Sequence, residues 1–299
     1  MALREDQLVL AADTRAEAAG ATHFDGGRVT VIRPAKGWAP LDLRELWDYR
    51  SLLYFLVWRD VKIRYKQTAI GAAWVVLQPL LTAAIFTVVF GHYVHLQTGG
   101  VPYLLLTYSA LLPWLLFANA LSTSTKSFVE NQALLTKVYV PRILIPVAPV
   151  LAGVVDFAVG SVFLVVLMAR YQVVPPLQVL FLPFFMLFAI VTAVAVTLWL
   201  SALNVKYRDV QYTVPFLVQA WFFATPVAYS AVVFPLGIRP WIGLNPMAGV
   251  VQGFRWALFG NHIAQFGHLM LFSFGVTFLL LVGGIAYFRR VERSLADVI

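Results

Sequence analysis

A succession of long apolar runs constrains this chain more than any other feature. Six segments stay apolar over roughly 20 residues, the length that an α-helix needs to cross a hydrocarbon layer of about 30 Å. They are residues 69–91, 103–124, 143–169, 177–202, 211–230 and 264–288. Charged residues make up only 12% of the chain, whereas a soluble domain carries about a quarter. The sequence therefore predicts an all-α integral membrane protein with six transmembrane helices.

The chain before the first apolar run divides into two parts. Residues 1–40 lack periodicity, and we expect a flexible cytosolic extension. Residues 41–66 carry apolar side chains at helical spacing, which predicts an interfacial amphipathic helix or, alternatively, a helix packed on soluble protein. The spaced apolar residues are Leu46, Tyr49, Leu53 and Leu56. Residues 67–299 are then expected to form one six-helix transmembrane domain.

An apolar segment between the fifth and sixth runs is interrupted repeatedly by proline and glycine. The interrupting residues are Pro235, Gly237, Pro240, Gly243, Pro246, Gly249 and Gly253. Because both residue types weaken a helix interior, we expect two short helices in the outer leaflet within residues 231–260 and no further span. Asn245 before Pro246 predicts a helix start there, since asparagine caps a helix and proline suits its first turn.

Positive charge is distributed unevenly between the loops. With both termini in the cytosol, all but three of the 22 lysines and arginines fall on the cytosolic side. The exceptions are Arg170, Arg239 and Arg255. An excess of Lys and Arg marks the cytosolic side of a membrane protein, so we expect both termini to be cytosolic.

Asp156 is the one acidic residue that falls within an apolar run. A carboxyl at that depth is costly, which by default indicates a function such as a proton relay or an ion site. The alternative is a carboxyl that is hydrogen-bonded to a neighbouring helix or that faces a wet channel without titrating. No other Asp, Glu, Lys or Arg lies within the runs to continue a relay, and this favours the second interpretation.

The sequence lacks the patterns of several enzyme sites. It contains no Gly-x-x-x-x-Gly-Lys-Ser/Thr loop for nucleotide phosphates, so we do not expect the chain to hydrolyse ATP by itself. His92 and His95 lie on the outer side without the further ligands that a metal site requires. We therefore expect no catalytic residue, no metal site and no cofactor in this chain.

Basic residues cluster immediately before the first apolar run. They are Arg59, Lys62, Arg64 and Lys66. Such a cluster anchors the start of the span at the cytosolic surface, because each basic residue near an anionic leaflet contributes about 1 kcal/mol of attraction. Arg and Lys also pair strongly with phosphate oxygens, so the cluster is a candidate site for a phosphate group.

Aromatic residues are abundant, and their rings stack well on the C–H faces of sugars. The alternative for each ring is an ordinary lipid-facing or core position. The candidates for lining a path through the membrane are Trp74, Phe86, Tyr103, Tyr108, Trp114, Phe117, Trp221, Phe222, Phe223 and Tyr229.

Four stretches of the sequence resemble a known family. They are "RDVKIRYKQTAIGAAWVVLQPLL" (59–81), "ENQALLTKVYVPRILIP" (130–146), "ALNVKYRDVQYTVPFLVQAWFFATPVAY" (202–229) and "LNPMAGVVQGFRWALFG" (244–260). In this order and spacing they are similar to the ABC-2 permeases that export polysaccharides, the O-antigen (Wzm-type), capsule and teichoic-acid transport subunits. The resemblance covers about residues 30–299.

The resemblance implies an ABC-2 fold like that of type V exporters, in the bacterial cytoplasmic membrane. It implies a homodimer around a channel, two separate ABC ATPase subunits that bind ATP and Mg²⁺, and export of a lipid-linked glycan whose diphosphate the basic cluster would receive. Residues 231–260 correspond to outer gate helices, although a fixed plug is equally compatible with their sequence. By motif position, the residues coupled to the ATPase would be Glu130, Asn131, Leu134, Leu135 and Lys137, followed by Lys206, Tyr207, Arg208 and Asp209.

Two other functions remain open at this point. An ABC-2 exporter of a small molecule or lipid would have much the same sequence pattern. A membrane-embedded transferase acting on lipid-linked sugars would need catalytic carboxylates or a histidine base, and the acid-free outer side disfavours it. No feature of the sequence predicts binding to nucleic acid.

Overall fold

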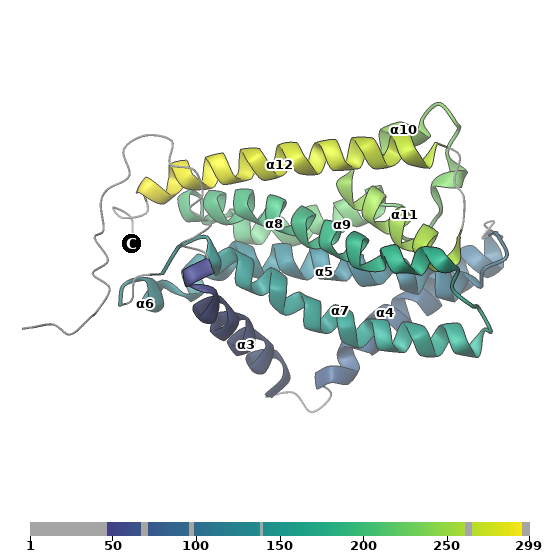
Figure 1. Ribbon diagram of the computed structural model, residues 1–299, viewed down its shortest axis with the longest axis horizontal. Coiled ribbons are helices and arrows are strands. Elements are labelled where there is room, and N and C mark those ends of the chain that lie inside the picture. Colours follow the sequence, from purple (N-terminus) through teal and green to yellow (C-terminus); the bar gives the residue numbers. More distant parts are fainter. Residues whose placement is uncertain (1–46, 67–70, 96–98, 138–139, 261–264, 295–299) are drawn as a thin grey trace, which may run out of the picture. The chain divides into compact units, whose positions relative to one another are not determined.

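The structure, a computed structural model, describes residues 47–66, 71–95, 99–137, 140–260 and 265–294. All regular secondary structure in these residues is helical (Figure 1), which confirms the all-α prediction. The chain divides into two compact units, Met1–Asp42 and Leu43–Ile299, and only the second contains described residues. The extension predicted for residues 1–40 and the start of the helix predicted for 41–66 lie outside them.

The helices follow one another along the chain with short connections. The longer ones are α3 (Arg50–Lys66), α4 (Gly71–Phe86), α5 (Tyr103–Glu130), α7 (Leu144–Arg170), α8 (Leu182–Lys206), α9 (Val210–Ala224), α11 (Pro246–Phe259) and α12 (Phe266–Ser294). The shorter ones are η1 (Thr87–Tyr93), α6 (Gln132–Leu135), η2 (Leu177–Phe181), η3 (Ala231–Val233) and α10 (Arg239–Ile242). The π-helix η1 continues α4 directly, and the 3-10 helix η2 leads into α8.

Each of the six apolar runs is occupied by a helix, and five of these are long and apolar enough to cross a membrane. The five are Ala73–Tyr93, Tyr103–Glu130, Leu144–Arg170, Leu177–Lys206 and Phe266–Glu292. The remaining run contains α9, which has 15 residues and falls short of the roughly 20 that a span requires. The protein is therefore a multi-pass membrane protein, and the count of six spans stays a prediction.

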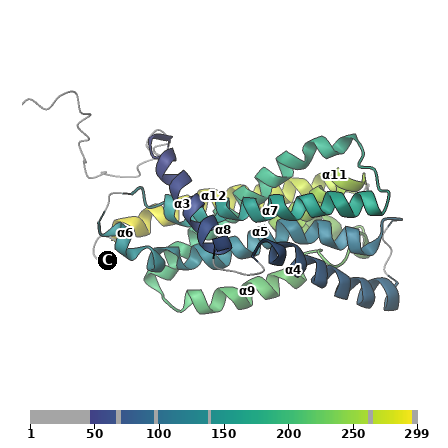
Figure 2. The same ribbon diagram turned by 90° about the horizontal axis from the view of Figure 1, so that it is seen from below.

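Helix α5 forms the centre of the bundle. It packs against α4, α7, α8, α9 and α11, while α12 lies along α8 (Figures 1 and 2). In α5, 83% of the apolar window is buried inside the chain, against 39% or less in the other candidate spans. Because lipid is as apolar as the protein interior, the outer helices can expose apolar side chains without cost. Among the candidate spans in the described residues, α5 is thus the one shielded from the surroundings almost entirely by this chain.

Helix α3 lies against α7 and touches the start of α4. It buries Leu56 and Val61 but exposes several large apolar side chains. These are Tyr54, Phe55, Trp58 and Ile63. Exposed aromatic residues beside a basic cluster are compatible with a helix at a membrane surface, the position predicted from the sequence.

The segment between α9 and α12 contains the two short α-helices expected there, α10 and α11. Asn245 caps α11 as predicted, since its side chain accepts a hydrogen bond from the Met247 amide at 3.1 Å and Pro246 follows it. The helix ends at Gly260, whose φ of 66° is left-handed. Most of α11 is buried against α5, α8 and α12, so it belongs to the core of the bundle and not to its surface.

Arg255 fastens α11 to the turn that follows α9. Its side chain is 2% exposed, and its guanidinium donates hydrogen bonds to backbone carbonyl oxygens only. The acceptors are the carbonyls of Pro226 (2.8 Å), Val227 (2.6 Å), Tyr229 (2.8 Å) and Leu106 (3.4 Å). A turn without regular secondary structure leaves carbonyl groups unpaired, and this arginine supplies their donors.

Candidate functional site

The two predicted coupling segments lie at the same end of the bundle, where α5 and α8 both end. We call it the charged end, because it carries Glu130, Lys137, Lys206, Arg208 and Asp209. Buried Asn204 holds it together: its Nδ2 donates to the Thr125 carbonyl oxygen at 2.9 Å, and its Oδ1 accepts the Gln211 amide at 3.0 Å. One side chain thus joins the end of α8 to α5 and to the start of α9.

The first coupling segment follows α5 directly. Glu130 is exposed at the last position of α5, and Asn131 connects it to the single turn of α6. Leu134 and Leu135 are half-buried in α6, and Lys137 is exposed just after it. The segment therefore exposes one charged residue on each side of the short helix, Glu130 before it and Lys137 after it.

The second coupling segment connects α8 to α9. Lys206 is the last residue of α8, and the three residues after it, Tyr207, Arg208 and Asp209, are exposed. The Lys206 ammonium lies 5.1 Å from the centroid of the Tyr207 ring, a cation–π distance. Both segments therefore offer exposed charge for a partner at one end of the chain.

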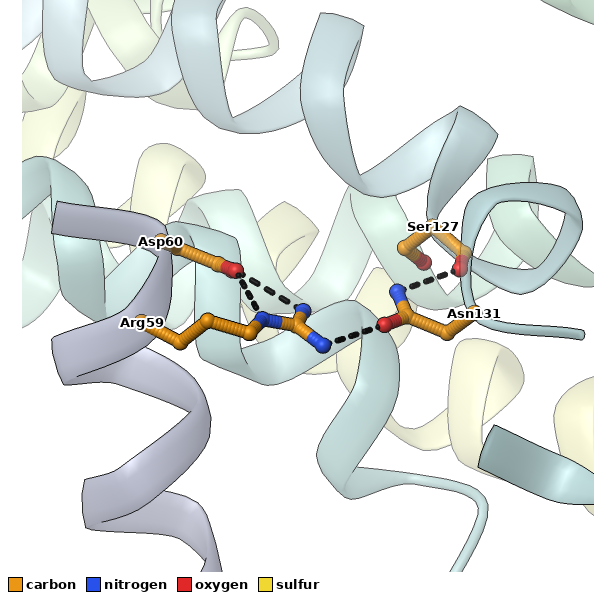
Figure 3. Close-up of polar contacts among 4 residues, drawn as sticks. All are labelled: Arg59, Asp60, Ser127 and Asn131. Atoms are coloured by element: carbon orange, nitrogen blue, oxygen red, sulfur yellow. Dashed lines mark hydrogen bonds and ion pairs between the residues drawn. The ribbon is translucent and has the colours of Figure 1, made fainter. Parts of the chain in front are cut away.

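Helix α3 contacts the first coupling segment through Arg59, as Figure 3 shows. The Arg59 guanidinium forms an ion pair with Asp60 (2.8 Å) and donates a hydrogen bond to Asn131 Oδ1 (2.7 Å). Asn131 in turn donates from Nδ2 to the Ser127 carbonyl oxygen at 2.8 Å. This chain of hydrogen bonds links a residue predicted to bind phosphate with a residue predicted to couple to an ATPase, 72 positions apart.

The C-terminal end of α3 is attached to α7 through Asp156. Its carboxylate forms an ion pair with Arg64 and accepts a hydrogen bond from the Tyr65 hydroxyl. Burial raises the pKa of Tyr65, and its hydrogen bond to the carboxylate adds to that rise, so the phenol stays protonated and able to donate. Asp156 is thus hydrogen-bonded to a neighbouring helix, the second of the two interpretations offered for it. The remaining basic residues of the cluster, Lys62 and Lys66, are exposed.

A cavity of about 650 Å³ lies between α3, α4, α5 and α7. Its polar wall consists of Arg64, Gln78, Asn119, Ser122, Thr123 and Asp156. The apolar wall includes Trp74, Val75, Leu112, Leu115, Leu116 and Phe157. The Arg64–Asp156 ion pair therefore lies at the edge of an open volume and not within tight packing.

Most of the aromatic candidates gather where α4, α5 and α9 meet. Their rings lie within about 6 Å of one another by centroid: the pairs are Phe86–Phe222 (5.9 Å), Trp114–Phe222 (5.5 Å), Trp114–Phe117 (5.6 Å), Phe117–Trp221 (5.0 Å) and Phe222–Phe223 (5.5 Å). Tyr229 lies just beyond α9, where its hydroxyl donates to the Phe223 carbonyl oxygen at 3.0 Å. These rings form a cluster that joins three helices.

The aromatic candidates differ greatly in exposure. Tyr103, Tyr108, Trp114 and Phe117 are between 0% and 8% exposed, so in this conformation they belong to the core of the chain. Phe223 and Trp74 are 65% and 54% exposed. A lining role for the four buried rings requires the helices around α5 to separate, and the lining role of the whole set stays a prediction.

Three residues that organise this region carry no signal in the sequence that marks their role. Asn204 and Tyr65 act through partners distant along the chain, and Asn119 faces a cavity formed by helices that are distant along the chain. Of the three, only Asn119 lies within an apolar run, and a polar residue in such a run is a recognisable signal. It identifies candidates but does not reveal what they contact.

Residues 51–259 match the model of the ABC-2 type transporter family. The chain is 29% identical over 259 residues to an O-antigen export system permease protein, RfbA, of Myxococcus xanthus, which covers 86% of this chain and 98% of the relative. It is 27% identical over 250 residues to the Klebsiella pneumoniae protein of the same name, covering 83% and 95%. A more distant relative is the polysialic acid transport protein KpsM of Escherichia coli, 22% identical over 248 residues and covering 79% and 92%.

Proposed function

The chain belongs to the ABC-2 type transporter family, and on that premise we propose that it is the permease subunit of a polysaccharide exporter. The observation that carries this proposal is similarity along nearly the whole length of relatives named as O-antigen permeases. A relative named for polysialic acid transport supports the same substrate class. The substrate is then a lipid-linked glycan, such as an O-antigen, a capsule polysaccharide or a teichoic acid.

ATP hydrolysis takes place on a separate ABC ATPase subunit, which also holds the Mg²⁺. The sequence has no phosphate-binding loop of its own, and the charged end offers two exposed segments on which a partner can dock. Two ATPase copies bind a homodimer of this chain. Glu130 to Lys137 and Lys206 to Asp209 form the docking surface of each protomer.

The charged end faces the cytosol, and the chain crosses the bacterial cytoplasmic membrane six times with both termini inside. The excess of lysine and arginine at the charged end supports this orientation. Helix α9 supplies the sixth crossing when the residues that follow it are included. Helices α10 and α11 then lie toward the outer leaflet.

The basic cluster on α3 receives the diphosphate of the lipid carrier. Arg64 faces the cavity, and exposed Lys62 and Lys66 extend the positive charge along the helix. Arg59 is engaged with Asp60 and Asn131, so it connects the cluster to the coupling segment. The exposed rings of Trp74 and Phe223 are the first candidates for contact with the moving glycan.

Co-expression with an ABC ATPase encoded beside this chain tests the proposal. We expect the two to co-purify and to restore surface glycan in a strain that lacks its exporter. A permease that purifies alone, and supports no glycan export with any adjacent ATPase, contradicts the proposed function. Export of a drug or free lipid in the same assay identifies the small-molecule alternative.

The coupling residues are tested in the same strain. Glu130→Gln, or Arg208→Ala together with Asp209→Ala, is expected to reduce export severely while the amount of permease in the membrane stays unchanged. Lys126→Gln is the matched control, because Lys126 is an exposed charged residue of α5 outside both segments. Normal export by the two test variants removes these residues from the coupling surface.

A further inference from the structure

The cavity between α3, α4, α5 and α7 contains polar groups that the packing of the chain does not use. Gln78 of α4 and Asn119 of α5 both line it. Within the part of the chain that the structure describes, neither amide side chain has a hydrogen-bond partner. An amide left unpaired in an apolar environment costs roughly 1–3 kcal/mol by mutational measures, so these two groups require a polar ligand or water.

Asn119 occupies an unusual position in α5. Asn119 is exposed, whereas all the remaining residues between positions 103 and 125 of this central helix are buried or half-buried. The exposure arises because the cavity opens beside it. The most shielded candidate span therefore presents one uncovered amide, and it does so toward an open volume with other polar groups on its walls.

The remaining walls supply complementary chemistry. Ser122 and Thr123 contribute hydroxyl groups, and the half-exposed ring of Trp74 contributes a flat apolar face. Amides and hydroxyls exchange hydrogen bonds with sugar hydroxyl groups, while an indole ring stacks on the C–H face of a sugar. A lipid acyl chain in the same volume would leave the Gln78 and Asn119 amides unpaired, whereas the Ser122 hydroxyl already donates to the Ala118 carbonyl oxygen at 2.9 Å.

Arg64 and Asp156 add one charged pair to the cavity wall. A guanidinium binds phosphate through charge-assisted hydrogen bonds, and a phosphate next to Arg64 competes with the Asp156 carboxylate for it. A displaced carboxylate is itself a good acceptor for sugar hydroxyl groups. A ligand that carries both a phosphate and sugar hydroxyl groups can thus replace the ion pair between Arg64 and Asp156: the phosphate binds Arg64, and the hydroxyl groups bind Asp156.

We propose that this cavity binds a glycosyl phosphate, with the sugar held by Trp74, Gln78 and Asn119 and the phosphate by Arg64. The assignment rests on the proposed function, in which the substrate is a lipid-linked glycan. A volume of about 650 Å³ falls within the usual range for a small-ligand pocket and far below that of a polysaccharide. The cavity therefore recognises the sugar next to the lipid phosphate, which every exported chain carries whatever its length.

Binding to the full-length permease in lipid nanodiscs tests this assignment. The probes are dodecyl phosphate, dodecyl β-glucoside and the dodecyl phosphodiester of glucose 1-phosphate, which together separate the phosphate, sugar and combined contributions. We expect the combined probe to bind about tenfold more tightly than dodecyl phosphate, the ratio that one or two additional hydrogen bonds produce. Equal affinity for these two probes overturns the proposal.

Variants assign the preference to the cavity. Gln78→Leu and Asn119→Leu should remove the advantage of the combined probe and leave dodecyl phosphate binding unchanged, whereas Arg64→Gln should weaken both phosphates. Gln219→Leu is the matched control, because Gln219 is an exposed amide of α9 outside the cavity. Thermal melting of each variant establishes that it is folded. Folded Gln78 and Asn119 variants that keep the full preference contradict the site.

Free glucose 1-phosphate distinguishes the two sources of a glycosyl phosphate. Weaker binding than the dodecyl form supports a lipid-linked ligand, and equal binding supports the site with a soluble sugar phosphate as ligand. The outcome is separable from the proposed function. A wild-type protein that exports glycan but shows no preference for the combined probe disproves the cavity assignment alone, whereas failure of export and of ATPase assembly disproves the proposed function.

Discussion

Arg64 and Arg255 both lie among apolar helices, yet their surroundings differ in kind. Arg255 is almost completely buried, and its guanidinium donates to four backbone carbonyl groups. The Arg64 side chain is 30% exposed, pairs with the carboxylate of Asp156, and lines a cavity. The carbonyl partners of Arg255 are fixed in the backbone. The carboxylate partner of Arg64 can be replaced by an anionic ligand.

The difference shows how to distinguish an arginine that stabilises the fold from an arginine that binds a ligand. Carbonyl groups of an irregular turn keep their places whether or not the arginine is present, so removing it leaves buried acceptors unpaired. A carboxylate at the edge of an open volume can turn to water or to a ligand instead. Arg255 is therefore expected to determine stability, and Arg64 to determine binding. The four predictions below test this contrast in order of expected effect.

The largest effect is expected from Arg255→Met. Loss of its hydrogen bonds leaves several buried carbonyls without donors and should reduce the free energy of unfolding by about 3 kcal/mol or more. This corresponds to a fall on the order of 10 °C in the melting temperature of the purified protein. Arg170→Met, at an exposed position, is the control and should melt like the wild type. An Arg255 variant with unchanged melting would erase the contrast between the two arginines.

A smaller effect is expected from Asp156→Leu, which changes the partner of Arg64, the second arginine of the comparison. It deprives Arg64 and Tyr65 of their shared acceptor and should release α3 from α7, at a cost of roughly 1–3 kcal/mol. Amide hydrogen exchange in α3 measures this release. Asp156→Asn keeps an acceptor for Tyr65 and should be intermediate. Equal protection of α3 in all three proteins would mean that α3 is held by its apolar contacts alone.

Asn131→Leu extends the comparison to the contact that Arg59 makes from the middle of α3. It removes the acceptor of Arg59 and should uncouple ATP hydrolysis from export, with a loss of stability of only about 1 kcal/mol. The ratio of glycan exported to ATP hydrolysed is the measurement. Asn131→Asp keeps the acceptor and should restore coupling, and Lys126→Gln, at an exposed position of α5 outside both coupling segments, should have no effect. Normal coupling in Asn131→Leu would show that the contact serves folding only.

The smallest effect is expected from Tyr65→Phe, which removes one hydrogen bond and should cost about 1 kcal/mol or less. Because folding raises the pKa of Tyr65, its contribution to stability is complete below a pH of about 10, the ordinary pKa of tyrosine. Above that pH the unfolded phenol loses its proton and the contribution declines. The difference in melting temperature between wild type and variant should therefore shrink as the pH rises past 10. A constant difference would indicate a packing effect.

The positions of the helices and their caps could be predicted to within a few residues. The apolar runs became α4, α5, α7, α8, α9 and α12, and the Asn245 cap was confirmed because it depends on two adjacent residues. Boundaries differed where a helix continued past its apolar run, as α5 does to Glu130. Such extensions include charged residues such as Lys126 and Glu130, which lower the hydropathy and end the apolar run before the helix ends.

The sequence by itself determined which segments are apolar enough to cross the membrane, which end of each carries the charge, and which family the chain resembles. These properties are local, because they depend on composition and on residues next to one another. Only the tertiary structure decided that Asp156 meets Arg64 from 92 residues away, that Arg255 pairs with a turn, and that Asn119 faces a cavity. The physical reason is that lipid and protein interior are equally apolar, so hydropathy cannot reveal which face of a helix meets another helix and which meets the membrane.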